Sequence, residues 1–189
     1  MINEGKLGIA LFSSQKQKSQ VLYGILLSVT GIFLLLLSYD PSLIVQYGLA
    51  GGMFLSSFFA FVTANKSKGS EIPYKFNWLL GLGMFVYALI ILIYGSTLDR
   101  FITLTMAFLL YFGIVEIIFG FGLMAYKKSI SLQVIVFRMI IGLLMAVGAV
   151  LMPGMALVDK NTSLVVAGTL ILFGGINFIL LANAVRKIA

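Results

Sequence analysis

The stretch Gly31-Ile32-Phe33-Leu34-Leu35-Leu36-Leu37 contains no polar side chain. The strands of a transmembrane barrel alternate between lipid-facing and lumen-facing residues, so polar side chains would be expected at every second position. A continuous apolar run instead favours a helix, because a helix satisfies its backbone hydrogen bonds within the segment itself. The apolar sequence around this stretch runs from Val21 to Ser38, close to the roughly 20 residues that a helix needs to cross a bilayer.

The whole chain has the composition of a membrane protein. It is 61% hydrophobic and only 10% charged, and its mean hydropathy is +1.11, well outside the range of soluble domains. The sequence therefore predicts an all-α integral membrane protein with six transmembrane helices. The predicted spans are Val21 to Ser38, Leu43 to Ala64, Trp78 to Gly95, Phe101 to Tyr126, Leu132 to Met152, and Leu164 to Ala184.

Glycines recur at a fixed spacing in these spans. Gly52, Gly113 and Gly174 lie 61 residues apart twice over (113 − 52 and 174 − 113). A repeat of this length indicates three copies of one helical hairpin, at 21–68, 78–128 and 132–187. All copies run in the same direction, so we expect a pseudo-threefold axis along the membrane normal. Residues 21–189 are then one membrane domain, preceded by a cytoplasmic tail at 1–20.

A second set of glycines follows the same repeat. Gly142 lies 61 residues after Gly81 (142 − 81), and Gly24 lies 57 before Gly81 (81 − 24). A polar residue stands four positions before each of these glycines: Gln20, Asn77 and Arg138.

Basic residues orient the spans. Ten fall on one side of the predicted membrane, and only Arg100 and Lys160 fall on the other; the ten are Lys6, Lys16, Lys18, Lys66, Lys68, Lys75, Lys127, Lys128, Arg186 and Lys187. The positive-inside rule places both termini in the cytoplasm. The net charge of +7 follows from this topology and from attraction to anionic lipid. The bilayer is thus the expected partner, and nucleic acid is not.

The chain has no cysteine and no histidine. This absence excludes the usual ligand sets of zinc, haem and iron–sulfur centres, and it excludes thiol- and histidine-based nucleophilic mechanisms. No glycine-rich phosphate loop opens a helix after a strand. We therefore expect no metal, no cofactor and no enzymatic activity.

The glycines of the second span have two interpretations. Gly48 and Gly52 form a G-x-x-x-G pattern, which allows close helix approach. The recurrence of Gly52 at Gly113 and Gly174 favours a packing contact inside the bundle. The alternative is an interface between subunits of a homo-oligomer.

Each predicted outer loop carries one acid: Asp40, Asp99 and Asp159. Asp40 precedes Pro41, a suitable pair for the cap and first residue of a helix, and Asp99 also stands near a helix start. Helix capping explains these residues. A ring of three acids that collects cations at an outer mouth is the alternative.

Glu116, Arg138 and Asn177 form a polar layer within the spans. Glu116 lies eleven residues before Lys127, and Arg138 lies ten after Lys128, so both reach a depth of about 15 Å on antiparallel neighbours. Asn177 is the repeat equivalent of Glu116 (177 − 116 = 61). Charges at such depth are normally paired or face water. The sequence predicts a Glu116–Arg138 ion pair, and the alternative is a functional site in a water-filled cavity.

Some of these segments resemble a known family. Trp78-Leu79-Leu80-Gly81, followed by Gly113-Ile114-Val115-Glu116-Ile117 and Lys127-Lys128, resembles the HdeD-like family of six-helix bacterial membrane proteins. Gly24-Ile25-Leu26-Leu27 with Asp40-Pro41, and Gly142-Leu143-Leu144 with Pro153, resemble the other copies of that repeat. The second copy departs from it, since Ser96-Thr97-Leu98-Asp99 replaces the proline turn.

The resemblance implies a non-enzymatic protein of the bacterial inner membrane with a role in acid or envelope stress tolerance. It carries no catalytic residues over to this chain. Two alternatives remain open. One is a small transporter or channel with a central polar site between the hairpins. The other is a structural or assembly subunit of a membrane complex.

Overall fold

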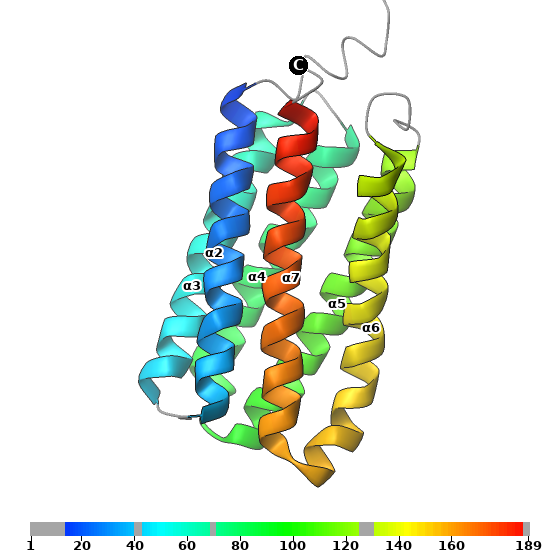
Figure 1. Cartoon of the computed structure of the whole chain (residues 1–189). Helices are drawn as coiled ribbons and strands as arrows, with labels where there is room; N and C mark the ends of the chain where they lie inside the picture. The colour runs from blue at the N-terminus through cyan, green and yellow to red at the C-terminus, as the bar shows by residue number, and fades with distance from the viewer. Residues whose placement is uncertain (1–13, 40–42, 69–70, 125–130, 187–189) are drawn as a thin grey trace, which may run out of the picture.

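A computed structural model describes residues 14–39, 43–68, 71–124 and 131–186, and these residues form an all-helical bundle (Figure 1). The helices are α2 (Ser14–Tyr39), α3 (Leu43–Lys66), α4 (Glu71–Tyr94), α5 (Leu98–Met124), α6 (Leu132–Val158) and α7 (Lys160–Arg186). All six are long and apolar enough to cross a membrane. The sequence prediction of six membrane-spanning helices is confirmed at this level.

The six helices form a ring in chain order. Each helix packs against its neighbours in the sequence, and α7 closes the ring against α2. Helix α2 begins, and α7 ends, at the same end of the bundle (Figure 1). We call this the Lys18 end, and the opposite one the Asp159 end. One hydrophobic core contains buried side chains from all six helices.

The most extensive contacts join α2 to α7, α5 to α6 and α3 to α4, whereas the two helices within each predicted hairpin touch less. Glycine backbones explain the first two contacts. A β-carbon on Gly31 would lie 2.8 Å from the carbonyl oxygen of Gly168, and one on Gly113 would lie 2.6 Å from that of Gly142. Because glycine has no side chain, the helix backbones meet directly at these points.

The recurring glycines share a position in the repeat but not a partner. Gly48 and Gly52 both face α2, where a β-carbon would meet the Phe33 ring and, at 2.6 Å, the Thr30 hydroxyl. Gly174 instead faces side chains of α5 and α6, Phe112 and Met145. Every one of these contacts lies inside the bundle.

Several helices are longer than the predicted spans. Helix α2 begins at Ser14, so residues 14–20 extend the helix where the sequence analysis placed a tail. Helix α6 continues through Pro153 to Val158, although its predicted span ends at Met152. Hydropathy marks where the apolar sequence begins and ends, whereas a helix continues as long as its backbone bonds are satisfied. Pro153 is tolerated because it is exposed near the end of α6, where the loss of one backbone hydrogen bond costs little free energy.

Two of the three predicted outer acids lie in described residues, and both have partners. Asp159 separates α6 from α7 and accepts hydrogen bonds from the Thr162 hydroxyl at 2.6 Å and from the backbone N–H groups of Asn161 and Thr162 at 3.0 Å each. These bonds, the Thr162 hydroxyl first, hold the pKa of Asp159 below its usual value. Asp159 therefore caps α7.

Asp99 lies in the first turn of α5, and its carboxylate pairs with the Lys160 ammonium at 2.6 Å. This exposed ion pair links the starts of α5 and α7. Asp40 lies outside the described residues.

Candidate functional site: a buried charged cluster

The predicted polar layer lies inside the ring, in the half nearer the Lys18 end. Glu116 is eight residues from the end of α5 (124 − 116), and Arg138 is six residues from the start of α6 (138 − 132). At about 1.5 Å per residue, both lie roughly 9–12 Å from that end. Both side chains are fully buried, with relative exposures of 1% and 0%.

Glu116 and Arg138 form the ion pair that their matched depths predict. Arg138 Nη2 donates a hydrogen bond to Glu116 Oε1 at 2.9 Å. Arg138 Nε lies 2.8 Å from Glu116 Oε2, but it is not aligned for a hydrogen bond. One charge-assisted bond and one close charge contact therefore join α5 to α6. The pair stands directly beside the glycine contact, since a β-carbon on Gly142 would lie 2.9 Å from Glu116 Cβ.

Three phenylalanines surround the guanidinium. Its central carbon lies 5.0 Å from the ring centroid of Phe76, 4.7 Å from that of Phe119 and 4.5 Å from that of Phe178. Phe76 and Phe119 are stacked on each other, with centroids 3.6 Å apart. The negative faces of aromatic rings attract cations, and the attraction is stronger where water is excluded. The charge of Arg138 is therefore stabilised both by Glu116 and by the rings of three other helices.

Tyr23 and Asn177 complete the cluster. The Tyr23 ring packs on Phe178, with centroids 4.4 Å apart. Tyr23 and Asn177 are both completely buried, and neither the hydroxyl of Tyr23 nor the amide of Asn177 has a hydrogen-bond partner. No hydrogen bond joins Asn177 to the ion pair, although it shares the same layer. Such orphaned polar atoms are costly in hydrocarbon and mark a site where a further polar group is expected.

Buried hydroxyls elsewhere in the described helices are satisfied locally. Thr30, Ser56 and Thr105 each donate to the backbone carbonyl four residues earlier, at 2.8 Å in all three cases. Thr105 also bonds the Tyr87 hydroxyl at 2.7 Å. Glu116, Arg138, Tyr23 and Asn177, in contrast, each carry a buried polar atom without a hydrogen-bond partner, which makes this cluster the candidate functional site.

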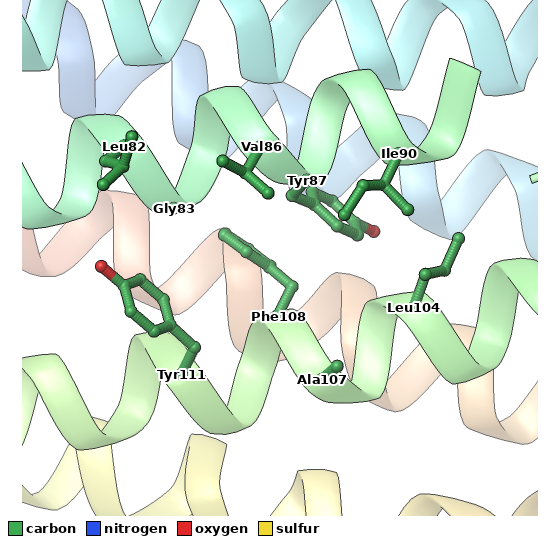
Figure 2. A pocket seen from close by; sticks show the side chains of 9 residues that line it. All are labelled: Leu82, Gly83, Val86, Tyr87, Ile90, Leu104, Ala107, Phe108 and Tyr111. Atoms are coloured by element: carbon green, nitrogen blue, oxygen red, sulfur yellow. The ribbon is translucent and has the colours of Figure 1, made fainter. Parts of the chain in front are cut away.

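The pockets in the described part of the chain include two that lie between α4 and α5. One has a volume of about 290 Å³ and includes Tyr87, Phe108 and Tyr111 in its lining (Figure 2). The other has a volume of about 280 Å³ and includes Phe76 and Phe119. Neither is lined by Glu116, Arg138 or Asn177.

The sequence predicts the charged and amide groups of the cluster but not its aromatic members. Phe76, Phe119, Phe178 and Tyr23 resemble the other aromatic residues of the spans, because their roles depend on helix rotation. One signal was available. Phe76 directly precedes the polar Asn77, and Phe178 directly follows Asn177, so an aromatic ring accompanies the polar residue on each of these two helices.

Comparisons with protein-family models, with curated proteins and with solved structures find no match to this chain.

Proposed function

We propose that this chain is a non-enzymatic protein of the bacterial inner membrane, similar to the HdeD-like proteins, which contributes to acid or envelope stress tolerance. The observation that supports this proposal is the buried Glu116–Arg138 pair. Protonation of Glu116 would leave the charge of Arg138 without its counter-ion in a low-dielectric interior. A drop in pH that reaches this site therefore destabilises the packing of α5 against α6, which gives the bundle a means to respond to acid.

The proposal includes the finer organisation predicted from the sequence. The bundle consists of three parallel hairpins about a pseudo-threefold axis, with both termini in the cytoplasm. The 61-residue spacing and the ring order of the helices support the repeat. The ordering of the contacts also supports it, because the three most extensive ones all join successive hairpins. The charge asymmetry between the two ends supports the orientation.

Survival of acid challenge tests the role in stress tolerance. A bacterial strain that lacks the gene would be complemented with the wild type, with the double variant Glu116→Gln/Arg138→Met, or with Gly51→Ala as a control at an exposed position. The double variant removes the titratable carboxyl without leaving a lone buried charge, so it should fold and yet fail to protect. Full protection by a double variant expressed at the wild-type level would reject the proposal.

A second candidate function is a small transporter or channel. The unpartnered hydroxyl of Tyr23 and amide of Asn177 favour it, because a polar substrate or a file of water molecules would satisfy them. It ranks second because neither pocket between α4 and α5 is lined by Glu116, Arg138 or Asn177. Proteoliposomes loaded with a pH-sensitive dye would report proton flux, and the same double variant should abolish it. Equal flux with the wild type, the double variant and empty liposomes would exclude proton conduction.

A further inference from the structure

The interface between α4 and α5, which we call the seam, is the least tightly packed helix–helix interface in the ring. Of the six neighbouring helix pairs, this one makes the least extensive contacts. The two pockets follow each other along it. The first is lined by Leu82, Val86 and Ile90 of α4, and the second by Lys75, Phe76 and Leu79 of the same helix.

Aromatic side chains form rigid walls along this seam. Tyr87 of α4 stacks on Phe108 of α5 in the first pocket, with centroids 4.3 Å apart and planes 13° apart. Phe76 and Phe119 stack in the same way in the second pocket, also at 13°. Figure 2 shows the Tyr87 and Phe108 rings between the two helices. Because stacked pairs fill the base of the seam, it cannot close by moving side chains inward.

Tyr111, which lines the first pocket, contacts Leu79, which lines the second. Its hydroxyl donates to the carbonyl oxygen of Leu79 at 2.6 Å, across the seam. Its ring lies so close to Gly83 that a β-carbon there would collide with it. Tyr111 therefore holds α4 and α5 at a fixed separation, with an apolar pocket on either side of the hydrogen bond.

The seam has the length and the polarity that suit a lipid tail. The lining runs from Lys75 to Ile90, a rise of fifteen residues (90 − 75), or about 22 Å at 1.5 Å per residue. One leaflet is about half of the 30 Å hydrocarbon core, so the seam extends from the membrane boundary past the midplane. The lining is apolar except at the Lys18 end, where Lys75 stands.

We propose that this seam binds one acyl chain of an anionic phospholipid from the leaflet at the Lys18 end, with the headgroup beside Lys75. The tail lies along the second pocket and reaches the first. Lysine at this position extends its apolar stem along the groove and carries its charge to the headgroup region. Exposed Lys66 and Lys68 lie at the same end of the bundle but line neither pocket.

The test uses the intact protein in nanodiscs that contain equal amounts of phosphatidylglycerol and phosphatidylcholine. Native mass spectrometry after release counts the lipids that remain bound. We expect the wild type to retain one phosphatidylglycerol in preference to phosphatidylcholine. Ala107→Phe fills the first pocket and should lose most of the retained lipid, whereas Val150→Phe, at an exposed site on α6, should retain it.

The headgroup contact is tested separately. Lys75→Gln should retain a lipid but lose the preference for phosphatidylglycerol, whereas Lys68→Gln should keep that preference. Circular dichroism melts of all four variants establish that they remain folded. Should Ala107→Phe retain as much lipid as Val150→Phe, the groove is not the binding site. Equal loss of selectivity in Lys75→Gln and Lys68→Gln would overturn the specific contact in favour of general surface charge.

Discussion

At the residue scale, the ion pair of Glu116 and Arg138 stabilises the bundle only while both charges are present. Both charged side chains are buried, so each depends on the other to offset the free-energy cost of leaving water. Breaking a buried pair is much more costly than replacing both partners by apolar groups of similar size. Arg138 has the additional support of three phenylalanine rings. These rings lower the cost of its charge but cannot replace a counter-ion.

A double-mutant cycle measures this dependence. Glu116→Gln or Arg138→Met alone should reduce the free energy of unfolding by about 3–5 kcal/mol, because each leaves an unpaired buried group. The double variant should recover part of that loss. Thermal or denaturant unfolding in detergent provides the measurement, and strictly additive losses would show that the two side chains do not depend on each other.

Asp159 gives a second prediction at this scale, with a defined pH dependence. Its pKa is lowered in the folded protein, so its contribution to stability is present above the ordinary aspartate value of about 3.9. That contribution is lost as the pH falls through the lowered pKa. The wild type should therefore melt at a higher temperature than Asp159→Ala at pH 6, and the difference should shrink below about pH 4. A difference that stays constant with pH would mean that the carboxylate charge has no part in the cap.

At the element scale, the glycines determine how closely the helices approach. Although they share one spacing in the sequence, they make three kinds of contact: backbone on backbone at Gly113, a hydroxyl at Gly52, and the side chains of Met145 and Phe112 at Gly174. The cost of adding a methyl group depends on which neighbour must move. A helix backbone cannot move alone, whereas a methionine terminus can change rotamer.

Alanine substitutions should follow this order. Gly113→Ala should be the most destabilising, by about 1–3 kcal/mol, because α5 and α6 must separate. Gly52→Ala should cost less, and Gly174→Ala least of the three. Gly51 is the matched control, since a β-carbon there meets nothing within 4 Å. Melting temperatures in one detergent decide the order, and equal changes at all four positions would mean that packing at these glycines does not govern the effect.

At the scale of the whole molecule, the sequence predicted the spans better than the site. Long apolar runs such as Leu132 to Met152 can be recognised as spans from the sequence, because only a helix satisfies its backbone in hydrocarbon. The pairing of Glu116 with Arg138 followed from depth alone. The phenylalanines around Arg138, the pockets of the α4–α5 seam and the different partners of the glycines could not be predicted in this way. Each of them depends on how a helix is rotated about its axis, which the similarly apolar faces of these spans leave undetermined.

Orientation in the membrane gives a prediction for the entire bundle. The chain has no cysteine, so single cysteines introduced at exposed Lys68 and Ser96 can be labelled without background. If the Lys18 end is cytoplasmic, Lys68→Cys should resist an impermeant thiol reagent in intact cells, whereas Ser96→Cys should react rapidly. The reverse pattern would invert the assigned topology.

The single residue between α6 and α7 constrains how the protein is made. Two helices of 27 residues each are separated only by Asp159, which leaves no length of chain for one to enter the bilayer and wait for the other. The last two spans are then expected to leave the insertion machinery as one unit. Because α7 also closes the ring against α2, the bundle remains open on that side until α6 and α7 have both entered the bilayer.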